Sequence, residues 1–416
     1  MNRRTFLTSL GALGAAAPFV PAALPAAPTV SAPEELGGQA LFACLPYAQW
    51  TAPGVTVIRW RTARPSTAFL FWSQEPAAPR DRWVKACTVQ DGMIAANTCD
   101  HAVTLRGLDP AKPLAFEAVS EPIASFGAYS IKRGATVGSG VRTLRPMRSP
   151  EGALSLAIFN DIHGRLELIP KLLALESTVQ AAPAAALFNG DCMDDCGSVE
   201  SAQKRFLRAL PPLAEAGLST LFLRGNHEYR GAMARRIREV LSPLDCGRYY
   251  GAFTLGSVRF LCIDTGEDKP DSAPVYGGLL QTDAYIDEQA AWLAREIESP
   301  EWKTAPWRVA VMHIPPTCGN VGDNDDWYGP TRLRKIMDPL FAKANLQAMI
   351  CAHTHVYNFL PPEKTGRPYP ILIGGGPSEK SATVTLLKAS NNVLDIRAFR
   401  ANGAALDGII HCERRA

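Results

Sequence analysis

The sequence predicts an α/β fold, in which a layered β-sandwich flanked by helices follows a smaller N-terminal all-β sandwich domain. Two observations support this fold class. From residue 152 onward, short apolar runs alternate with longer amphipathic stretches, as strands alternate with helices. Between residues 31 and 143, short runs of alternating polar and apolar residues are separated by turn residues such as Pro53-Gly54, which is typical of a small β-sandwich.

The composition and net charge of the chain argue against some classes of function. The chain has 416 residues, of which 47% are hydrophobic and 20% charged, as in ordinary globular proteins of two or three domains. The net charge is only +3, so there is no electrostatic reason to expect a nucleic-acid partner. No run of about 18 apolar residues occurs, so we expect no transmembrane segment.

The first 28 residues have the features of an export signal. Arg3 and Arg4 precede Phe6 and Leu7, and an Ala/Gly-rich run and small residues follow. This pattern is typical of a twin-arginine signal peptide. We therefore expect residues 1–28 to be read by the twin-arginine export machinery, and the protein to be periplasmic or secreted.

Residues 31–145 are predicted to form the all-β domain. Strands are expected at 55–61, 67–72 and 101–105, with a linker at 145–150. Cys87 and Cys99 either join a hairpin or form a free buried pair.

Residues 152–412 are predicted to form the α/β domain. Its first strand, 154–159, is almost wholly apolar, as a strand covered on both faces requires. The other predicted strands are 184–188, 220–223, 258–263, 308–312 and 348–351, and 383–410 should hold two or three closing strands. The predicted helices are 166–178, 198–216, 232–241, 283–298 and 331–344.

Polar residues that bind metals follow five of these strands directly. In α/β folds, ligands bind beyond the carboxyl ends of the strands, so these residues should meet at one rim. Five of the seven histidines belong to this set, whereas His101 and His411 are solitary and are expected to be structural. The candidate metal ligands are Asp161, His163, Asp191, Asn226, His313, His353 and His355.

A mixed set of carboxylate, carboxamide and imidazole suits transition ions such as Mn, Fe or Zn. Seven ligands are too many for one ion and fit two, with one carboxylate shared between them. The sequence therefore predicts a binuclear site for divalent or trivalent transition metal ions.

These blocks resemble the signature of the calcineurin-like metallophosphoesterase superfamily. The blocks at Asp161, Asp191, Asn226, His313 and His353 follow the superfamily's order, with spacings of 30, 35, 87 and 40 residues. The resemblance covers about residues 154–376.

The resemblance implies how the site is divided. One ion would be held by Asp161, His163, Asp191 and His355, and the other by Asp191, Asn226, His313 and His353, with Asp191 as the bridge. His227 would protonate the leaving-group oxygen or stabilise phosphoryl charge, and Glu228 would orient His227.

The implied activity is hydrolysis of a small phosphorylated substrate by a metal-bound hydroxide. A phosphodiesterase or nucleotide hydrolase on the same site remains an alternative, as does a non-catalytic surface binding protein, although the complete ligand set argues against the last.

The N-terminal domain resembles the fibronectin-type-III-like domain of purple acid phosphatases, on residues 41–64 and 101–109. Two of the departures from that branch bear on the metal ligands. His163 stands where those enzymes have glycine, and Asp194 stands where they have a metal-binding tyrosine. We therefore expect a metal site without tyrosine.

Three further segments allow more than one interpretation. Cys192 and Cys196 bind metal, form a disulfide or are simply buried, and Asp194 and Asp195 either support the ligands or lie in a solvated loop. The segment 315–330 either faces the substrate or forms an exposed acidic turn. Gly374-Gly-Gly376 is expected to form a tight strand exit near the site rather than a phosphate-binding loop, because no Lys-Ser/Thr pair follows it.

Overall fold

A computed structural model describes residues 41–319 and 326–414 of the chain. The predicted signal segment, residues 1–28, lies outside the described residues, as do residues 320–325 of the predicted substrate-facing segment. None of the helices in the described part of the chain has the length and apolar character needed to span a bilayer.

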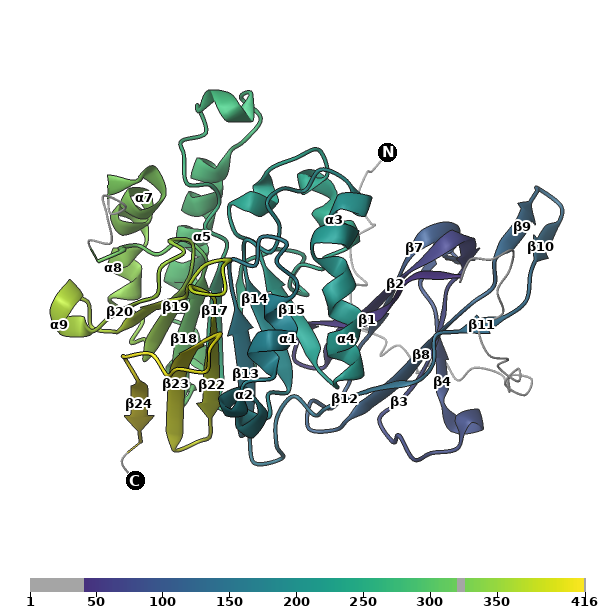
Figure 1. The fold of residues 1–416 in the computed structure, drawn as a ribbon, viewed down its shortest axis with the longest axis horizontal. Helices are drawn as coiled ribbons and strands as arrows, with labels where there is room; N and C mark the ends of the chain where they lie inside the picture. The colour runs from purple at the N-terminus through teal and green to yellow at the C-terminus, as the bar shows by residue number, and fades with distance from the viewer. Residues whose placement is uncertain (1–40, 320–325, 415–416) are drawn as a thin grey trace, which may run out of the picture.

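The centre of the fold consists of two facing sheets (Figure 1). The first has the order β24-β23-β22-β13-β14-β15-β1-β2-β7, with β13, β14 and β15 parallel. The strands that it takes from the predicted α/β domain are β13 (Leu154–Phe159), β14 (Ala185–Asn189), β15 (Ser219–Leu223), β22 (Thr383–Ala389), β23 (Val393–Arg400) and β24 (Ile410–Glu413). The closing strands β22 to β24 confirm the prediction for 383–410.

The second sheet has the order β16-β17-β18-β19-β21-β20. Strands β17, β18, β19 and β21 run parallel, and the two edge strands are antiparallel to their neighbours. The strands are β16 (Gly251–Leu255), β17 (Val258–Ile263), β18 (Trp307–Met312), β19 (Ala348–Cys351), β20 (Asn358–Leu360) and β21 (Ile371–Ile373).

Successive side chains along each strand point to opposite faces of its sheet, so the two sheets together have three layers of buried side chains. In β13, Leu156 and Ile158 point between the two sheets, whereas Ala157 and Phe159 point toward the helices on the outer face. In β18, Val309 and Val311 likewise point between the sheets. Both faces of each strand are buried, which explains why these runs are apolar throughout.

Helices cover the outer face of each sheet (Figure 1). The first group is α1 (Leu168–Leu173), α2 (Glu176–Ala181), α3 (Val199–Arg205), α4 (Leu210–Glu215) and the 3₁₀ helix η4 (Ala234–Glu239). The second is α5 (Thr282–Glu296), α6 (Pro300–Thr304), α7 (Tyr328–Ile336) and α8 (Asp338–Phe341), and a short helix, α9 (Pro362–Thr365), follows β20.

Three predicted helices are divided, and the first of them, 166–178, breaks at Ala174 and Leu175 between α1 and α2. The stretch 198–216 divides near Phe206, and α4 begins anew with Pro211 in its first turn. The stretch 331–344 divides at Met337, and Pro339 opens α8. Proline is tolerated in a first turn but not in a helix interior, so each proline marks a restart.

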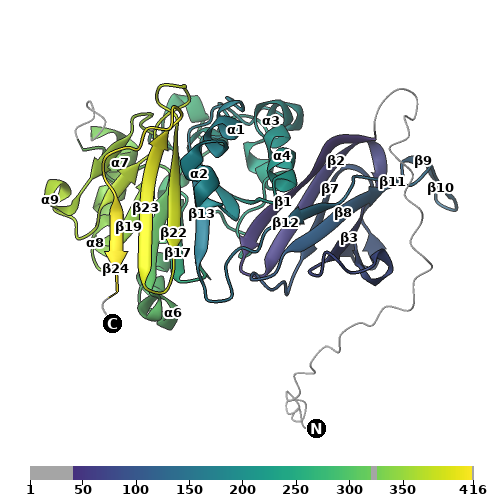
Figure 2. The ribbon, with the colours of Figure 1, turned by 60° about the horizontal axis from the view of Figure 1, so that its bottom comes forward.

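The N-terminal region is a β-sandwich, as predicted, and it shares a sheet with the α/β region. Strand β1 pairs in parallel with β15 at Gln49 and Thr220, so the first sheet continues into the sandwich (Figure 2). The strands of this shared half are β1 (Phe42–Ala52), β2 (Val55–Thr67) and β7 (Ala96–Leu105). The facing sheet contains β3 (Phe69–Ser73), β4 (Val84–Ala86), β8 (Leu114–Ser120), β11 (Val137–Gly138) and β12 (Arg142–Leu144).

Two small hairpins complete this region: β5 (Val89–Gln90) with β6 (Met93–Ile94), and β9 (Ile123–Phe126) with β10 (Ile131–Arg133). The second projects from the sandwich in Figure 1. The predicted linker is held in place, because the Arg145 backbone N–H donates to Gly217 O at 2.8 Å and the guanidinium of Arg145 donates to Pro183 O at 3.0 Å.

The cysteine alternatives are resolved in favour of free thiols. Cys87 and Cys99 are both free, and neither is fully buried. Cys192 and Cys196 are free and buried. Burial raises the pKa of both thiols, so they stay protonated and are poor metal ligands.

Candidate metal centre

The seven predicted ligands lie in the loops that follow the carboxyl ends of five strands. Asp161 and His163 follow β13, Asp191 follows β14, and Asn226 follows β15. The histidines of the second sheet, His313, His353 and His355, follow β18 and β19. Because the parallel strands of both sheets end at the same rim, these loops come together.

One group of potential ligands contains Asp161, His163, Asp191 and His355. One ligand atom from each of the four lies within 4.8 Å of all the others. His355 Nε2 is 3.3 Å from Asp161 Oδ1, and His163 Nε2 is 3.5 Å from Asp191 Oδ2.

A second group contains Asp191, His313 and His353, whose ligand atoms also lie within 4.8 Å of one another. His313 Nε2 is 3.1 Å from Asp191 Oδ2. Asn226 Oδ1 lies 3.0 Å from His353 Nδ1, which brings the carboxamide into this group. Asp191 is common to both groups, as a bridging carboxylate has to be.

Left-handed backbone conformations are concentrated in these ligands. Nine non-glycine residues of the described chain have positive φ, and five of them are Asp161, His163, Asp191, His353 and His355, with φ between 45° and 76°. Each such residue costs on the order of 1–3 kcal/mol, and such strain is found chiefly at functional sites. The loops therefore hold these side chains against a local energetic cost.

Two glycines make the close approach of the loops possible. A Cβ at Gly190 would lie 2.5 Å from His313 Nδ1, and one at Gly225 would lie 2.2 Å from Asp191 Oδ1. Both contacts are far shorter than any real Cβ contact, so only glycine fits.

Glu228 has a different role from the predicted one. Its buried carboxylate accepts hydrogen bonds from the backbone N–H groups of Gly225, Asp191 and Cys192, at 2.8 to 2.9 Å. Among the described residues it makes no hydrogen bond to His227. Glu228 therefore holds the Asp191 loop against the Gly225 loop and does not orient the imidazole.

Two asparagines that were not predicted as site residues support the ligands. Asn189 O accepts a hydrogen bond from His313 Nδ1 at 2.8 Å, which directs Nε2 of that ring toward Asp191. Asn160 Nδ2 donates to Asp161 Oδ2 at 2.7 Å and to Gly375 O at 2.6 Å. The glycine run 374–376 thus lies beside the site, as expected, because a Cβ at Gly376 would also lie 2.5 Å from His355 Cβ.

The charges in the site are strongly coupled. Burial opposes the ionisation of both Asp191 and His313, but the attraction between their opposite charges has the larger effect on their pKa values. Burial would lower the pKa of His313, but Asp191 raises it to about 10. Burial would raise the pKa of Asp191, but His313 and His163 hold it well below its usual range. Burial and the neighbouring His313 lower the pKa of His353 to about 4.

The unmet polar atoms of the site fit metal ions. Asp161 Oδ1, His313 Nε2 and His353 Nε2 are buried and make no hydrogen bond within the described part of the chain. Buried polar atoms are rarely left without a partner, since each costs about 1–3 kcal/mol. All three belong to the predicted ligands, and the two predicted ions together would satisfy all three.

His227 lies at the exposed edge of the cluster. Its Nδ1 donates to Asp194 O at 2.7 Å, which leaves Nε2 directed toward the site, 3.9 Å from Asp191 Oδ2. Arg230 Nη1 lies 3.1 Å from the same Nε2.

Asp194 supports the site and is not only a solvated loop residue. Its carboxylate lies 3.1 Å from His163 Nδ1, and its other oxygen accepts from Arg205 at 2.9 Å. Asp195 contacts the same Arg205 at 3.2 Å but no predicted ligand. The two departures from the purple-phosphatase pattern, His163 and Asp194, are thus in contact with each other.

No tyrosine of the described chain enters the two ligand groups. Tyr229 donates its phenolic hydrogen to Asp264 Oδ1 at 2.9 Å and accepts from Arg224. Tyr357 donates to Asp407 O. The hydroxyl groups of Tyr229 and Tyr357, which are adjacent to the ligand blocks, therefore bond to residues other than the predicted ligands.

The other buried or isolated histidines are structural, as expected. His101 Nε2 lies 2.9 Å from Thr62 Oγ1, and its ring lies against Trp60 in the sandwich core. His411 Nδ1 lies 2.7 Å from Asp395 Oδ1 on the exposed edge of the first sheet.

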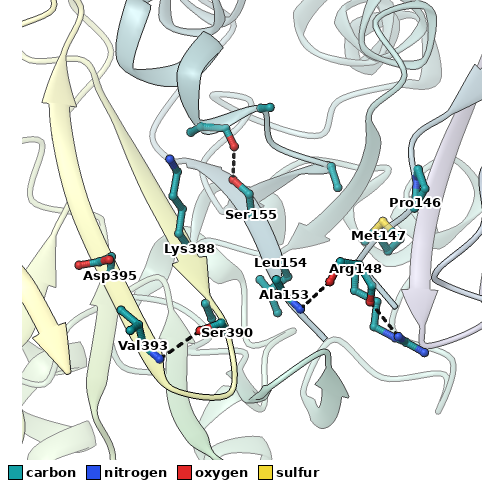
Figure 3. Close-up of a pocket in the computed structure, with 15 residues that line it drawn as sticks. Pro146, Met147, Arg148, Ala153, Leu154, Ser155, Lys388, Ser390, Val393 and Asp395 are labelled. Atoms are coloured by element: carbon teal, nitrogen blue, oxygen red, sulfur yellow. Dashed lines mark hydrogen bonds between the residues drawn. The ribbon is translucent and has the colours of Figure 1, made fainter. Parts of the chain in front are cut away.

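Two cavities lie at opposite ends of β13. One, of about 600 Å³, opens beside His163 and His355. The other, of about 480 Å³, lies between the start of β13, β22 and the 146–149 segment (Figure 3). In this second cavity Ser155 Oγ donates to Ala181 O, and Ser149 Oγ accepts from Ala153 N, so these polar groups are already paired. Of the two, only the first cavity is lined by predicted metal ligands, His163 and His355.

The segment after His313 approaches the rim where it is described. The Trp327 ring lies 5.3 Å from the His353 ring, edge to face, and is 38% exposed. Trp327 therefore forms a wall of the site on the side of the second group, which favours the substrate-facing interpretation of segment 315–330.

Comparison with known proteins agrees with this geometry. A model of the calcineurin-like phosphoesterase family matches residues 154–357, the range that contains every predicted ligand. No curated protein matches the sequence. A purple acid phosphatase, PPD1 from yellow lupin (Lupinus luteus) seeds, shares the fold, with 12% identity over 89% of this chain and 74% of that chain and a TM-score of 0.64.

Two further structures are similar over a smaller part of the chain. GAP50, the anchor in the inner membrane complex of Plasmodium, has 12% identity over 64% of this chain and 90% of its own, with a TM-score of 0.42. A putative 5'-nucleotidase from Staphylococcus aureus has 13% identity over 63% of this chain and 54% of its own, with a TM-score of 0.36.

Proposed function

We propose that this metallophosphoesterase, whose residues 154–357 form a calcineurin-like phosphoesterase domain, hydrolyses phosphate esters at a binuclear metal site. The observation that carries the proposal is the pair of ligand groups that share Asp191. One ion is assigned to Asp161, His163, Asp191 and His355, and the other to Asp191, Asn226, His313 and His353.

The ions would supply two effects when bound: positive charge for the phosphoryl oxygens, and a lower pKa for bound water. The ligand set contains only two carboxylates, those of Asp161 and Asp191. It therefore offsets only part of the charge of two divalent ions, and the site remains attractive to an anionic ester.

His227 is assigned the proton transfer. Overall, water adds to phosphorus, the bond between phosphorus and the ester oxygen breaks, and the departing oxygen takes up a proton. The Asp194 carbonyl holds the Nδ1 proton of His227, so Nε2 is the nitrogen that can carry a proton to that oxygen.

The test is hydrolysis of a phosphomonoester and a phosphodiester, p-nitrophenyl phosphate and bis(p-nitrophenyl) phosphate, by the metal-loaded protein. We expect about two ions per chain by elemental analysis, loss of activity on chelation, and recovery with Mn²⁺, Fe²⁺ or Zn²⁺. The preferred ester decides between phosphomonoesterase and phosphodiesterase. Absence of hydrolysis of both esters with every metal would contradict the proposal.

We also propose export through the twin-arginine pathway. The support is Arg3-Arg4 followed by an apolar, small-residue run in residues 1–28. Replacing both arginines by lysine should leave unprocessed precursor inside the cell, as detected by fractionation and immunoblotting. Normal export of that variant would overturn this part of the proposal.

A further inference from the structure

The 600 Å³ cavity beside His163 and His355 is lined by positively charged side chains that are not predicted metal ligands. Arg165 and Arg205 line it, together with Asp194 and Ser378. Its volume is within the range of sites for small organic ligands, about 300–1,000 Å³. It adjoins two predicted ligands of one ion, so a substrate whose phosphoryl group lies on the ions can extend into it.

The two arginines are not equivalent. Arg205 forms ion pairs with Asp194 at 2.9 Å and with Asp195 at 3.2 Å, so its charge is offset. Within the described residues, the guanidinium of Arg165 has neither an ion pair nor a hydrogen-bond partner. Arg165 therefore carries the uncompensated positive charge of the cavity.

The backbone holds Arg165 at this position. The Arg165 N–H donates to Ile162 O at 2.8 Å, which closes a tight turn through Gly164 at a φ of 73°. The same turn carries His163. The side chain is exposed, so its guanidinium is free to meet a ligand without first leaving a protein partner.

The opposite side of the rim differs in charge. There Arg230 is paired with both Glu267 and Asp268, and Trp327 presents an aromatic ring beside His353. An anionic substituent is thus favoured on the Arg165 side and not on the Trp327 side. The difference in charge between the two sides determines the orientation in which a substrate lies across the ions.

We propose that the cavity binds a second anionic group of the substrate, a carboxylate or a phosphate, and that Arg165 is the residue that selects for it. This inference rests on the proposed function. The preferred substrates would then be phosphate esters that carry a further negative charge a few bonds from the reacting phosphorus.

The experiment uses three esters with similar leaving groups: 4-methylphenyl phosphate, 4-(carboxymethyl)phenyl phosphate and 4-(phosphonomethyl)phenyl phosphate. The full-length metal-loaded enzyme should show a kcat/KM about tenfold higher for an anionic ester than for the neutral one, since only the anionic esters can accept a charge-assisted hydrogen bond from Arg165. The carboxylate and phosphonate arms show which anion the cavity prefers.

Arg165→Ala should reduce that selectivity ratio to about one, chiefly through KM, and Arg165→Lys should restore part of it. Arg208→Ala is the matched control, because Arg208 is an exposed arginine of the same region that does not line the cavity. Its selectivity ratio should equal that of the unmodified enzyme.

Three results would overturn the inference: no preference for the anionic esters in the unmodified enzyme, a preference that survives in Arg165→Ala, or an equal loss for all three esters. Hydrolysis of none of the three by the unmodified enzyme contradicts the proposed function itself, and this inference with it. The two failures are therefore distinguishable.

Discussion

The metal centre and the N-terminal sandwich each bury a histidine, and the two histidines differ in the charge of the groups that face them. His101 lies in the sandwich among apolar side chains, bonded to a neutral hydroxyl, and burial lowers its pKa to about 4. His313 faces Asp191, which raises its pKa to about 10. Burial alone therefore says little about function. The facing carboxylates and the concentration of left-handed backbone in the ligand loops distinguish the reactive region from the structural one.

The strongest test of this contrast removes the carboxylate shared by the two ligand groups. Asp191→Ala should lower kcat by about 10³-fold or more, since electrostatic stabilisation of the reacting group is the largest single contribution to catalysis. Elemental analysis should show less metal in both positions. Asp100→Ala, a carboxylate of the sandwich, is the control and should keep activity and metal. Full activity in Asp191→Ala would mean that the ligand groups are wrongly assigned.

A smaller loss is expected from the proton donor. His227→Gln should lower kcat by about 10²-fold, within the usual range for general acid catalysis. The loss should be greater for an alkyl phosphate than for p-nitrophenyl phosphate, because a poor leaving group needs the proton more. Metal content should not change. A loss that is independent of the leaving group would assign His227 to binding instead.

The buried histidine of the sandwich should also make the stability of the protein depend on pH. The pKa of His101 is about 4 in the fold and about 6.5 when unfolded, so the unfolded chain binds the proton first. Stability is therefore full above about pH 6.5 and falls as the pH drops toward 4, by roughly 2–3 kcal/mol from this group.

The measurement is urea unfolding at pH 7.5 and pH 4.5, for the unmodified protein and for His101→Gln. The pH-dependent loss should be smaller in His101→Gln by roughly 2 kcal/mol. Comparing the two proteins cancels the pH dependence of metal binding at the other region. An identical loss in both would show that His101 is protonated without cost.

The smallest effect is expected at the surface of the sandwich. Arg61 and Asp100 form an ion pair at 2.7 Å, with side chains 21% and 39% exposed. Solvent-exposed pairs of this kind contribute about 0.2–1 kcal/mol, so Asp100→Asn should shift the free energy of unfolding by about 0.5 kcal/mol and leave kcat unchanged. A change in kcat would show that the sandwich influences the site.

Much of the site was predictable because its residues follow recognisable strands. His313 comes directly after an apolar run and Asp161 two residues after the end of another, and each run predicts where the side chain will be placed. Glu228 was placed in the right loop with the wrong role, because its partners are backbone N–H groups that carry no sequence signal. Asn160 was missed for the same reason: one of its two partners is a backbone carbonyl 215 residues away.

The fold class was predictable, but the pairing of β1 with β15 was not. That pair joins Gln49 to Thr220, and its support includes a hydrogen bond from Thr220 Oγ1 to Ala48 O at 2.9 Å. Neither strand has a composition that distinguishes an edge from an interior position. The hydrophobic periodicity of the sequence identifies the strands and their buried faces. Which two strands pair with each other depends on the whole sheet.

The shared sheet also affects how the protein can be cut. A fragment that began after the predicted linker would leave β15 without its β1 neighbour, and β15 is a five-residue strand buried throughout, Ser-Thr-Leu-Phe-Leu. Such an exposed apolar edge is a template for pairing with other chains. The isolated catalytic region should therefore self-associate and precipitate on expression, because the sandwich covers this edge of the sheet.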